Sequence, residues 1–104
     1  MFSQRGTHYP VFGKGPELRA LLEERVKARQ AQGFRVGLSA QMFGAEGVAY
    51  ILTTSYPDLA ALEKNRKDNQ SDPAFIAYNA KLAGLQRMQT KTELFEILVP
   101  VPPM

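Results

Sequence analysis

The segment that decides the fold is residues 34–55, which read FRVGLSAQMF, then GAEG, then VAYILTTS. Two strand-like runs joined by a short loop with a glycine at each end are typical of a β-hairpin. The first run alternates, with Leu38, Ala40 and Met42 among the apolar residues of one face, so we expect these to contribute to the core. The second run is apolar at consecutive positions over residues 49–52, which predicts a central strand buried on both faces.

The segments before and after the hairpin supply the remaining elements. Residues 2–11 (FSQRGTHYPV) are a strand candidate, and the leucine spacing over residues 16–32 predicts a helix that Gly33 ends. Residues 56–88 read as two helical pieces with a break near residues 70–72. The closing residues 93–99 (ELFEILV) form a strand candidate that is apolar on both faces apart from its two glutamates.

Cap residues locate the starts of these two helical pieces. Ser55 followed by Asp58 resembles a capping box, with Pro57 in the first turn. Asp72 followed by Pro73 is the usual pairing of a capping carboxylate with a proline at the first helical position, so it restarts the helix after the break.

This element order predicts the fold class, α+β. A βαββαβ chain most simply forms a ferredoxin-like, four-stranded antiparallel sheet with its helices on one face. At 104 residues we expect a single domain over residues 1–104. Two strands apolar on both sides would leave an uncovered apolar sheet face, which soluble monomers rarely tolerate. We therefore expect a homodimer through the open sheet face, because two-fold assemblies are the commonest.

Composition excludes several classes of function. The absence of cysteine removes disulfides, thiolate metal sites and cysteine nucleophiles, and it favours a cytoplasmic location. A net charge of +3 without a dense basic block argues against a nucleic-acid partner. No apolar run approaches the roughly 18 residues that span a bilayer, so we expect no membrane partner. The Gly13-Lys14-Gly15 loop lacks the spacing of a phosphate-binding loop.

His8 is the only histidine and is the candidate catalytic acid or base, because its ordinary pKa lies nearest neutrality. The alternative is a structural strand histidine with one nitrogen satisfied. One histidine without cysteines or a close carboxylate cluster offers too few ligands for a metal, so we predict no metal site and no cofactor.

Tyr50, Arg66 and Tyr78 are the candidate ligand-binding residues. The tyrosines, with Tyr56, could gather at one end of a cavity and offer hydroxyl groups to a polar substrate. Arg66 lies one turn after Leu62 and could direct its guanidinium towards an anionic ligand. The alternatives are amphipathic core aromatics for the tyrosines and a solvated helix face for Arg66.

Three segments resemble the NIPSNAP-type members of the dimeric α/β-barrel superfamily: FGKGPELRALLEE at residues 12–24, residues 44–82 from GAEG to NAKL, and TELFEILVP at residues 92–100. The most specific part is YPDL at residues 56–59, Arg66, and DPAF at residues 72–75 with Tyr78. The resemblance implies two sheets packed face to face as a barrel, with a cavity between each sheet and its own helices. Such proteins range from cofactor-free monooxygenases and isomerases to members with no established activity.

These observations support one main hypothesis and an alternative. The main one is a small-molecule-binding dimeric α/β-barrel protein, either a cofactor-independent oxygenase or an isomerase acting on an apolar or aromatic metabolite. The alternative is a non-catalytic dimeric binding or scaffold module. Nucleic-acid binding through the sheet ranks last, because the run VAYILTTS contains neither lysine nor arginine.

Overall fold

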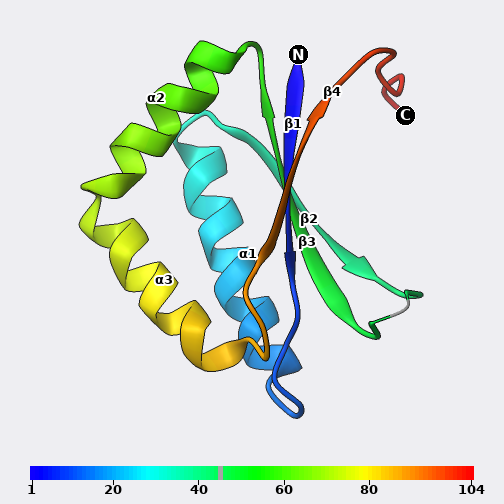
Figure 1. Ribbon diagram of the computed structural model, residues 1–104, viewed down its shortest axis with the longest axis vertical. Coiled ribbons are helices and arrows are strands. Elements are labelled where there is room, and N and C mark those ends of the chain that lie inside the picture. The colour runs from blue at the N-terminus through cyan, green and yellow to red at the C-terminus, as the bar shows by residue number, and fades with distance from the viewer. Residues whose placement is uncertain (45) are drawn as a thin grey trace.

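The computed structural model describes residues 1–44 and 46–104. Its elements follow the predicted order, with the second helical region in two pieces (Figure 1): β1 (Phe2–His8), α1 (Gly15–Ala31), β2 (Arg35–Gln41), β3 (Ala49–Tyr56), α2 (Leu59–Gln70), α3 (Pro73–Leu85) and β4 (Lys91–Glu96). Of the predicted hairpin loop at residues 44–47, residue 45 lies outside the described residues. The βαββαβ prediction is confirmed.

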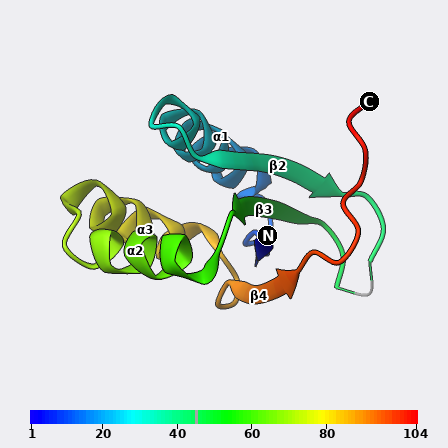
Figure 2. The same cartoon turned by 90° about the horizontal axis from the view of Figure 1, so that it is seen from above.

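The four strands form one antiparallel sheet in the order β2-β3-β1-β4. The predicted central position of the second hairpin arm, β3, is therefore confirmed. Figure 2 shows the three helices on one side of this sheet. Gly6 in β1 lies opposite Leu52 in β3 and Thr92 in β4, and His8 lies opposite Tyr50. Directly opposite residues share a face, so these five positions all face the helices.

Local chemistry sets the helix ends. Gly33 follows α1 with φ 91°, a backbone angle that glycine adopts without the steric penalty of a Cβ. The Asp72 carboxylate accepts a hydrogen bond from the Ala74 backbone N–H, as predicted for a cap. The predicted capping box at Ser55 is wrong, because Ser55 is still paired within the sheet. Asp58 caps α2 instead, accepting from the Ala61 backbone N–H at 2.8 Å.

Strand β4 occupies Lys91–Glu96 instead of the predicted residues 93–99. Its partner sets both limits: Lys91 pairs with Thr7 near one end of β1, and Glu96 pairs with Phe2 at the other. The last hydrogen bond of this ladder joins the Ile97 N–H to the Met1 carbonyl oxygen at 2.9 Å. Residues 98–104 have no strand to pair with and extend away from the sheet (Figure 1).

The hydrophobic core fills only one end of the space between helices and sheet. Leu18 and Leu22 of α1 are fully buried and pack with Leu82 of α3, and further apolar side chains surround them: Leu21, Leu38, Tyr50, Leu52, Tyr78 and Leu85. Met42, expected in the core, is 80% exposed because β2 ends at Gln41. Beyond Leu22, Val26 of α1 and Val36 of β2 are still buried, but the sheet also presents polar Gln4, Thr54 and Thr92 to a space that is not filled.

The outer sheet face is more polar than predicted. β3 presents Ile51 there, but its next outward residues are Thr53 and Ser55. The register places Arg5 between Thr53 and Glu93 in one row across this face. The expectation that β3 is apolar on both faces is therefore wrong over its second half. Among the described residues, no helix has the length and apolar character needed to cross a membrane.

Candidate functional site

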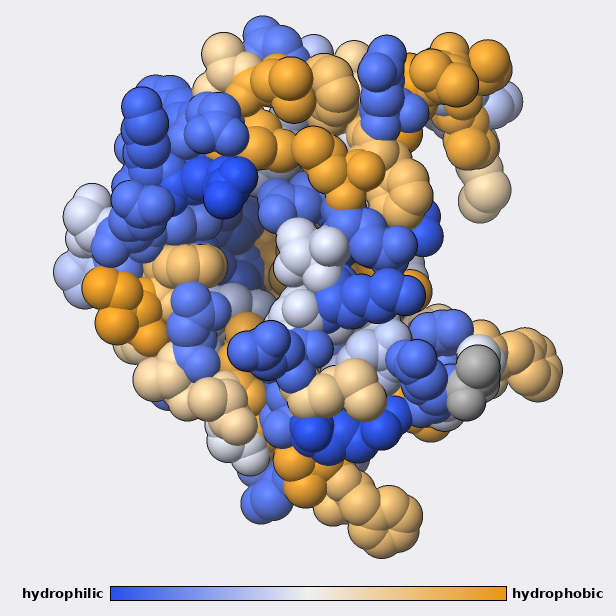
Figure 3. Space-filling model, viewed as in Figure 1, coloured by the Kyte–Doolittle hydropathy of each residue, from blue (hydrophilic) through white to orange (hydrophobic). Residues whose placement is uncertain are grey.

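A cavity of about 420 Å³ lies between the sheet and the helices, beyond the end of the core. Figure 3 shows it as a hollow with mostly hydrophilic surface around its mouth. All four strands and all three helices line it, through Gln4, Gly6, His8, Arg25, Arg29, Val36, Leu52, Thr54, Tyr56, Asn65, Arg66, Asn69, Gln70, Phe75, Tyr78, Asn79, Leu82, Thr90 and Thr92. Its volume lies within the range of about 300–1,000 Å³ common for small-molecule sites.

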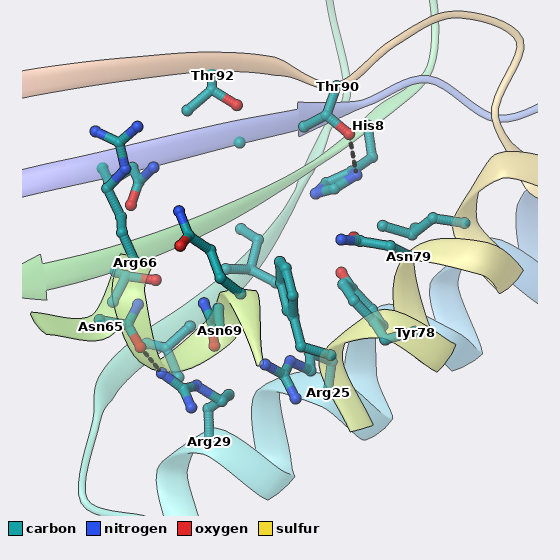
Figure 4. A pocket seen from close by; sticks show the side chains of 18 of the residues that line it. His8, Arg25, Arg29, Asn65, Arg66, Asn69, Tyr78, Asn79, Thr90 and Thr92 are labelled. Atoms are coloured by element: carbon teal, nitrogen blue, oxygen red, sulfur yellow. Dashed lines mark hydrogen bonds between the residues drawn. The ribbon is translucent and has the colours of Figure 1, made fainter. Parts of the chain in front are cut away.

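His8 is held in this wall by two side chains from the segment between α3 and β4. Its Nδ1 lies 2.5 Å from Oε1 of Gln86, and the Thr90 hydroxyl lies 3.3 Å from the same nitrogen and donates to Gln86 Oε1 at 3.1 Å. An amide oxygen can only accept, so Nδ1 carries the proton and donates it to Gln86. The other ring nitrogen, Nε2, is left as an acceptor, and Figure 4 shows the ring edge opposite the Thr90 contact directed into the cavity.

The surroundings of His8 keep it neutral. It is only 5% exposed, and this burial lowers its pKa below the ordinary value, against a smaller opposing effect of the Gln86 hydrogen bond. At neutral pH the imidazole is therefore uncharged, with a lone pair on Nε2. Gly6 leaves room beside this nitrogen, since a Cβ at that position would lie 3.4 Å from Nε2 and 3.4 Å from the Thr90 methyl group.

The predicted tyrosines divide between cavity and core. Tyr78 lines the cavity with its hydroxyl directed inwards (Figure 4). Burial raises the pKa of Tyr78 to about 12, so the hydroxyl stays protonated and can donate a hydrogen bond. Tyr56 also lines the cavity, where its oxygen accepts from the Asn65 amide at 2.7 Å. Tyr50 packs around the leucine core instead, and its role as a ligand contact stays a prediction.

Arg66 lines the cavity as well, at the α2 side. Its guanidinium forms an exposed ion pair with Glu63 at 3.5 Å, a type of contact that contributes little to stability and is easily exchanged. The position of Arg66 does not test its predicted role as a ligand contact, which stays a prediction. The structure thus brings His8, Arg66 and Tyr78 into one cavity, with Tyr50 outside its wall.

Sequence reasoning missed Arg25 and Arg29 of α1, which also line the cavity. A signal existed: Leu21, Arg25 and Arg29 are spaced four residues apart, so they share one helix face beside the buried stripe. Gln86 was also missed, and a single glutamine in a helix-end segment carries no comparable signal. Across residues 1–44 and 46–104, no group of three or more His, Cys, Asp or Glu side chains is placed to hold a metal ion.

Comparison with solved structures gives matches over almost the whole chain. An uncharacterized NIPSNAP domain protein from Burkholderia xenovorans superposes with a TM-score of 0.78 at 17% identity, covering 97% of this chain and 100% of that one. Rv0793 from Mycobacterium tuberculosis gives 0.72 at 20% identity, covering 97% and 98%. An antibiotic biosynthesis monooxygenase gives 0.69 at 15% identity, covering 96% and 100%.

The chain has a ferredoxin-like fold, which it shares with these proteins over almost its whole length. The resemblance to NIPSNAP-type proteins is thereby confirmed in the path of the backbone. No family model and no curated protein matches the sequence. Sequence identities this low establish a shared fold only. Because one fold supports many activities, the function has to be argued from the cavity.

Proposed function

We propose that the protein binds a small organic molecule in the cavity and that His8 removes a proton from a carbon atom of it. The observation that carries the proposal is a buried, neutral histidine whose Nδ1–H is fixed by Gln86 and whose Nε2 faces the cavity. A neutral imidazole with a free nitrogen lone pair can act as a general base. Such a step is the one that a cofactor-independent isomerase or oxygenase needs first.

The neighbouring side chains fit this chemistry. When Nε2 accepts a proton, the positive charge that forms on the ring is stabilised by the Gln86 oxygen against Nδ1–H. The Tyr78 hydroxyl and the Asn79 amide, both in the cavity wall, can donate hydrogen bonds to an oxygen on which negative charge develops. An isomerase would return the proton from Nε2 to a different carbon atom, whereas an oxygenase would let the carbanion react with dioxygen.

A thermal-shift screen of a metabolite library tests the binding part of this proposal, because a ligand that prefers the folded state raises the melting temperature. The matched variant is His8→Asn, whose side-chain amide can still donate to Gln86 but offers no base at the position of Nε2. We expect this variant to bind the identified ligand and to lose turnover. Full turnover by His8→Asn would remove the catalytic role and leave the alternative, a non-catalytic binding module.

We also propose that a second copy of the chain covers the open sheet face. The helices cover only one face, and Ile51 is among the outward residues of the other (Figure 2). Large exposed apolar side chains gather in two further places, the hairpin tip with Met42 and Phe43 and the C-terminal residues 98–104. Such surfaces commonly mark contacts with a partner. The cytoplasmic location expected from composition stays a prediction.

A further inference from the structure

The cavity wall carries an unbalanced positive charge. Arg25, Arg29 and Arg66 line it, and no aspartate or glutamate is among its lining residues in the part of the chain that the structure describes. Arg66 has Glu63 beside it at the surface, but neither Arg25 nor Arg29 forms an ion pair within the described residues. Partly buried cations without carboxylate partners are costly to keep, which favours a site that is completed by a bound anion.

We infer that the ligand of this cavity is an organic anion, with a carboxylate group held by Arg25 and Arg29 and an aromatic or apolar body lying towards His8. The inference rests on the proposed function, since it names the class of molecule that the same cavity takes. It adds one requirement to an apolar or aromatic metabolite: the ligand must carry a negative charge at the end of the cavity remote from His8.

Arg25 is held in a way that leaves its hydrogen-bonding edges free. Its Cζ lies 5.4 Å from the centre of the Phe75 ring and 5.3 Å from the centre of the Tyr78 ring, so two aromatic side chains position the guanidinium. A cation–π contact of this kind uses the positive charge of the guanidinium and takes up none of its N–H groups with an oxygen acceptor. Since no described acceptor takes a hydrogen bond from Arg25, those groups can bind both oxygens of a carboxylate.

Arg29, one helical turn further along α1, is placed by a similar arrangement. Its Cζ lies 3.6 Å from the centre of the Phe34 ring, and its two terminal nitrogens donate to the side-chain oxygens of Gln32 and Asn65. Both acceptors are neutral amides. Burial lowers the pKa of Arg29 and the positive charge of Arg25 lowers it further, against smaller opposing effects of Tyr56, Asp72 and Asp68. An anion between the two guanidinium groups would relieve this repulsion.

The rest of the wall suits an apolar body. Figure 4 shows Arg25 and Arg29 on one side of the cavity and His8 with Thr90 on the other. The lining also includes Leu52, Phe75 and Leu82, which offer apolar surface for a ring or hydrocarbon chain. A molecule anchored by its carboxylate at the arginines would therefore extend its other end towards Nε2.

The test uses pairs of compounds with the same shape and different charge. Benzoate with benzamide and 2-naphthoate with 2-naphthamide each replace a carboxylate by a neutral carboxamide. Binding is measured by titration calorimetry at low ionic strength, with inorganic phosphate as a third arm. We expect the carboxylate of at least one pair to bind roughly tenfold or more tightly than its amide, since hydrogen bonds to charged groups are the stronger ones. Phosphate alone should bind more weakly than that carboxylate.

Variants assign the preference to the arginines. Arg25→Met keeps an aliphatic chain over the two rings without the charge, and it should reduce the carboxylate preference to about twofold or less. Arg25→Lys retains the positive charge and should keep part of it. Arg19→Met is the matched control, because Arg19 lies on the same helix, is paired with exposed Glu23 at 2.8 Å and is outside the cavity wall. This control should leave the preference unchanged.

The outcomes separate this inference from the proposed function. Equal binding of carboxylate and amide overturns the inference while the cavity remains a small-molecule site. Binding of phosphate as tight as that of the carboxylates also overturns it, because the organic body would then contribute nothing. If neither pair binds, the inference is overturned, whereas the proposed function fails only when the library screen also yields no ligand. Loss of the preference in Arg19→Met would show nonspecific charge attraction and overturn the assignment.

Discussion

The hydrogen bond between His8 and Gln86 can be tested by Gln86→Met, which keeps the length of the side chain and removes the acceptor. His8 is 5% exposed, so its Nδ1–H would lose a partner in a place that water scarcely reaches. An unsatisfied buried donor costs about 1–3 kcal/mol, and the Thr90 oxygen at 3.3 Å is a weaker substitute, so we expect about 1–2 kcal/mol. For a domain of this size that corresponds to a fall in melting temperature of roughly 4–16 °C.

A double-mutant cycle measures whether this loss comes from the pair. Free energies of unfolding are obtained from urea denaturation for the wild type, Gln86→Met, His8→Phe and the double variant. Once His8 is replaced, no buried N–H needs the Gln86 oxygen, so Gln86→Met should cost less there by about 0.5 kcal/mol or more. Gln89→Met, an exposed neighbouring glutamine, should change stability little. Costs that add to within about 0.3 kcal/mol would refute a direct His8–Gln86 interaction.

Three further predictions concern the same elements. Burial lowers the pKa of His8 in the folded state, so its contribution to stability is complete above the unfolded pKa of about 6.5 and is lost as the pH falls from there through the folded pKa. The urea midpoints at pH 7.5 and 5.5 should therefore differ more for wild type than for His8→Asn. Gly6→Ala should lower turnover more than ligand affinity, since its methyl group would lie 3.4 Å from Nε2; equal losses in kcat and affinity would contradict this. Ile51→Lys or Ile97→Lys should abolish a dimer or prevent folding, and sedimentation of either variant as a stable dimer would contradict the proposed interface.

The fold was accessible from sequence because its determinants are local. The alternation over residues 34–41, the helix stop at Gly33 and the cap at Asp72 each act within a few residues. The end of β4 could not be predicted from local sequence, because it depends on where β1, its partner strand, ends. Ser55 had the right spacing for a cap, but pairing with two neighbouring strands kept it in β3.

The candidate site was accessible only in part, because polar helix residues read alike whether they face water or a cavity. Arg25 and Arg29 follow the last leucine of the core cluster along α1, and both line the cavity. Tyr50 and Tyr56 have the same strand parity, yet Tyr50 lies by the core and Tyr56 by the cavity. Which end of the interface is filled is a property of the packed molecule.

The state of His8 is the central claim, and the chain allows a direct measurement because it contains only this one histidine. A long-range nitrogen–proton correlation spectrum of protein labelled with ¹⁵N-histidine reports the ring tautomer without assignment of other residues. We predict a neutral ring at pH 7 with the proton on Nδ1, and a shift of the Nε2 resonance when 2-naphthoate or a ligand from the metabolite screen binds. A charged ring at pH 7, a proton on Nε2, or an Nε2 resonance that does not respond to bound ligand would contradict the account.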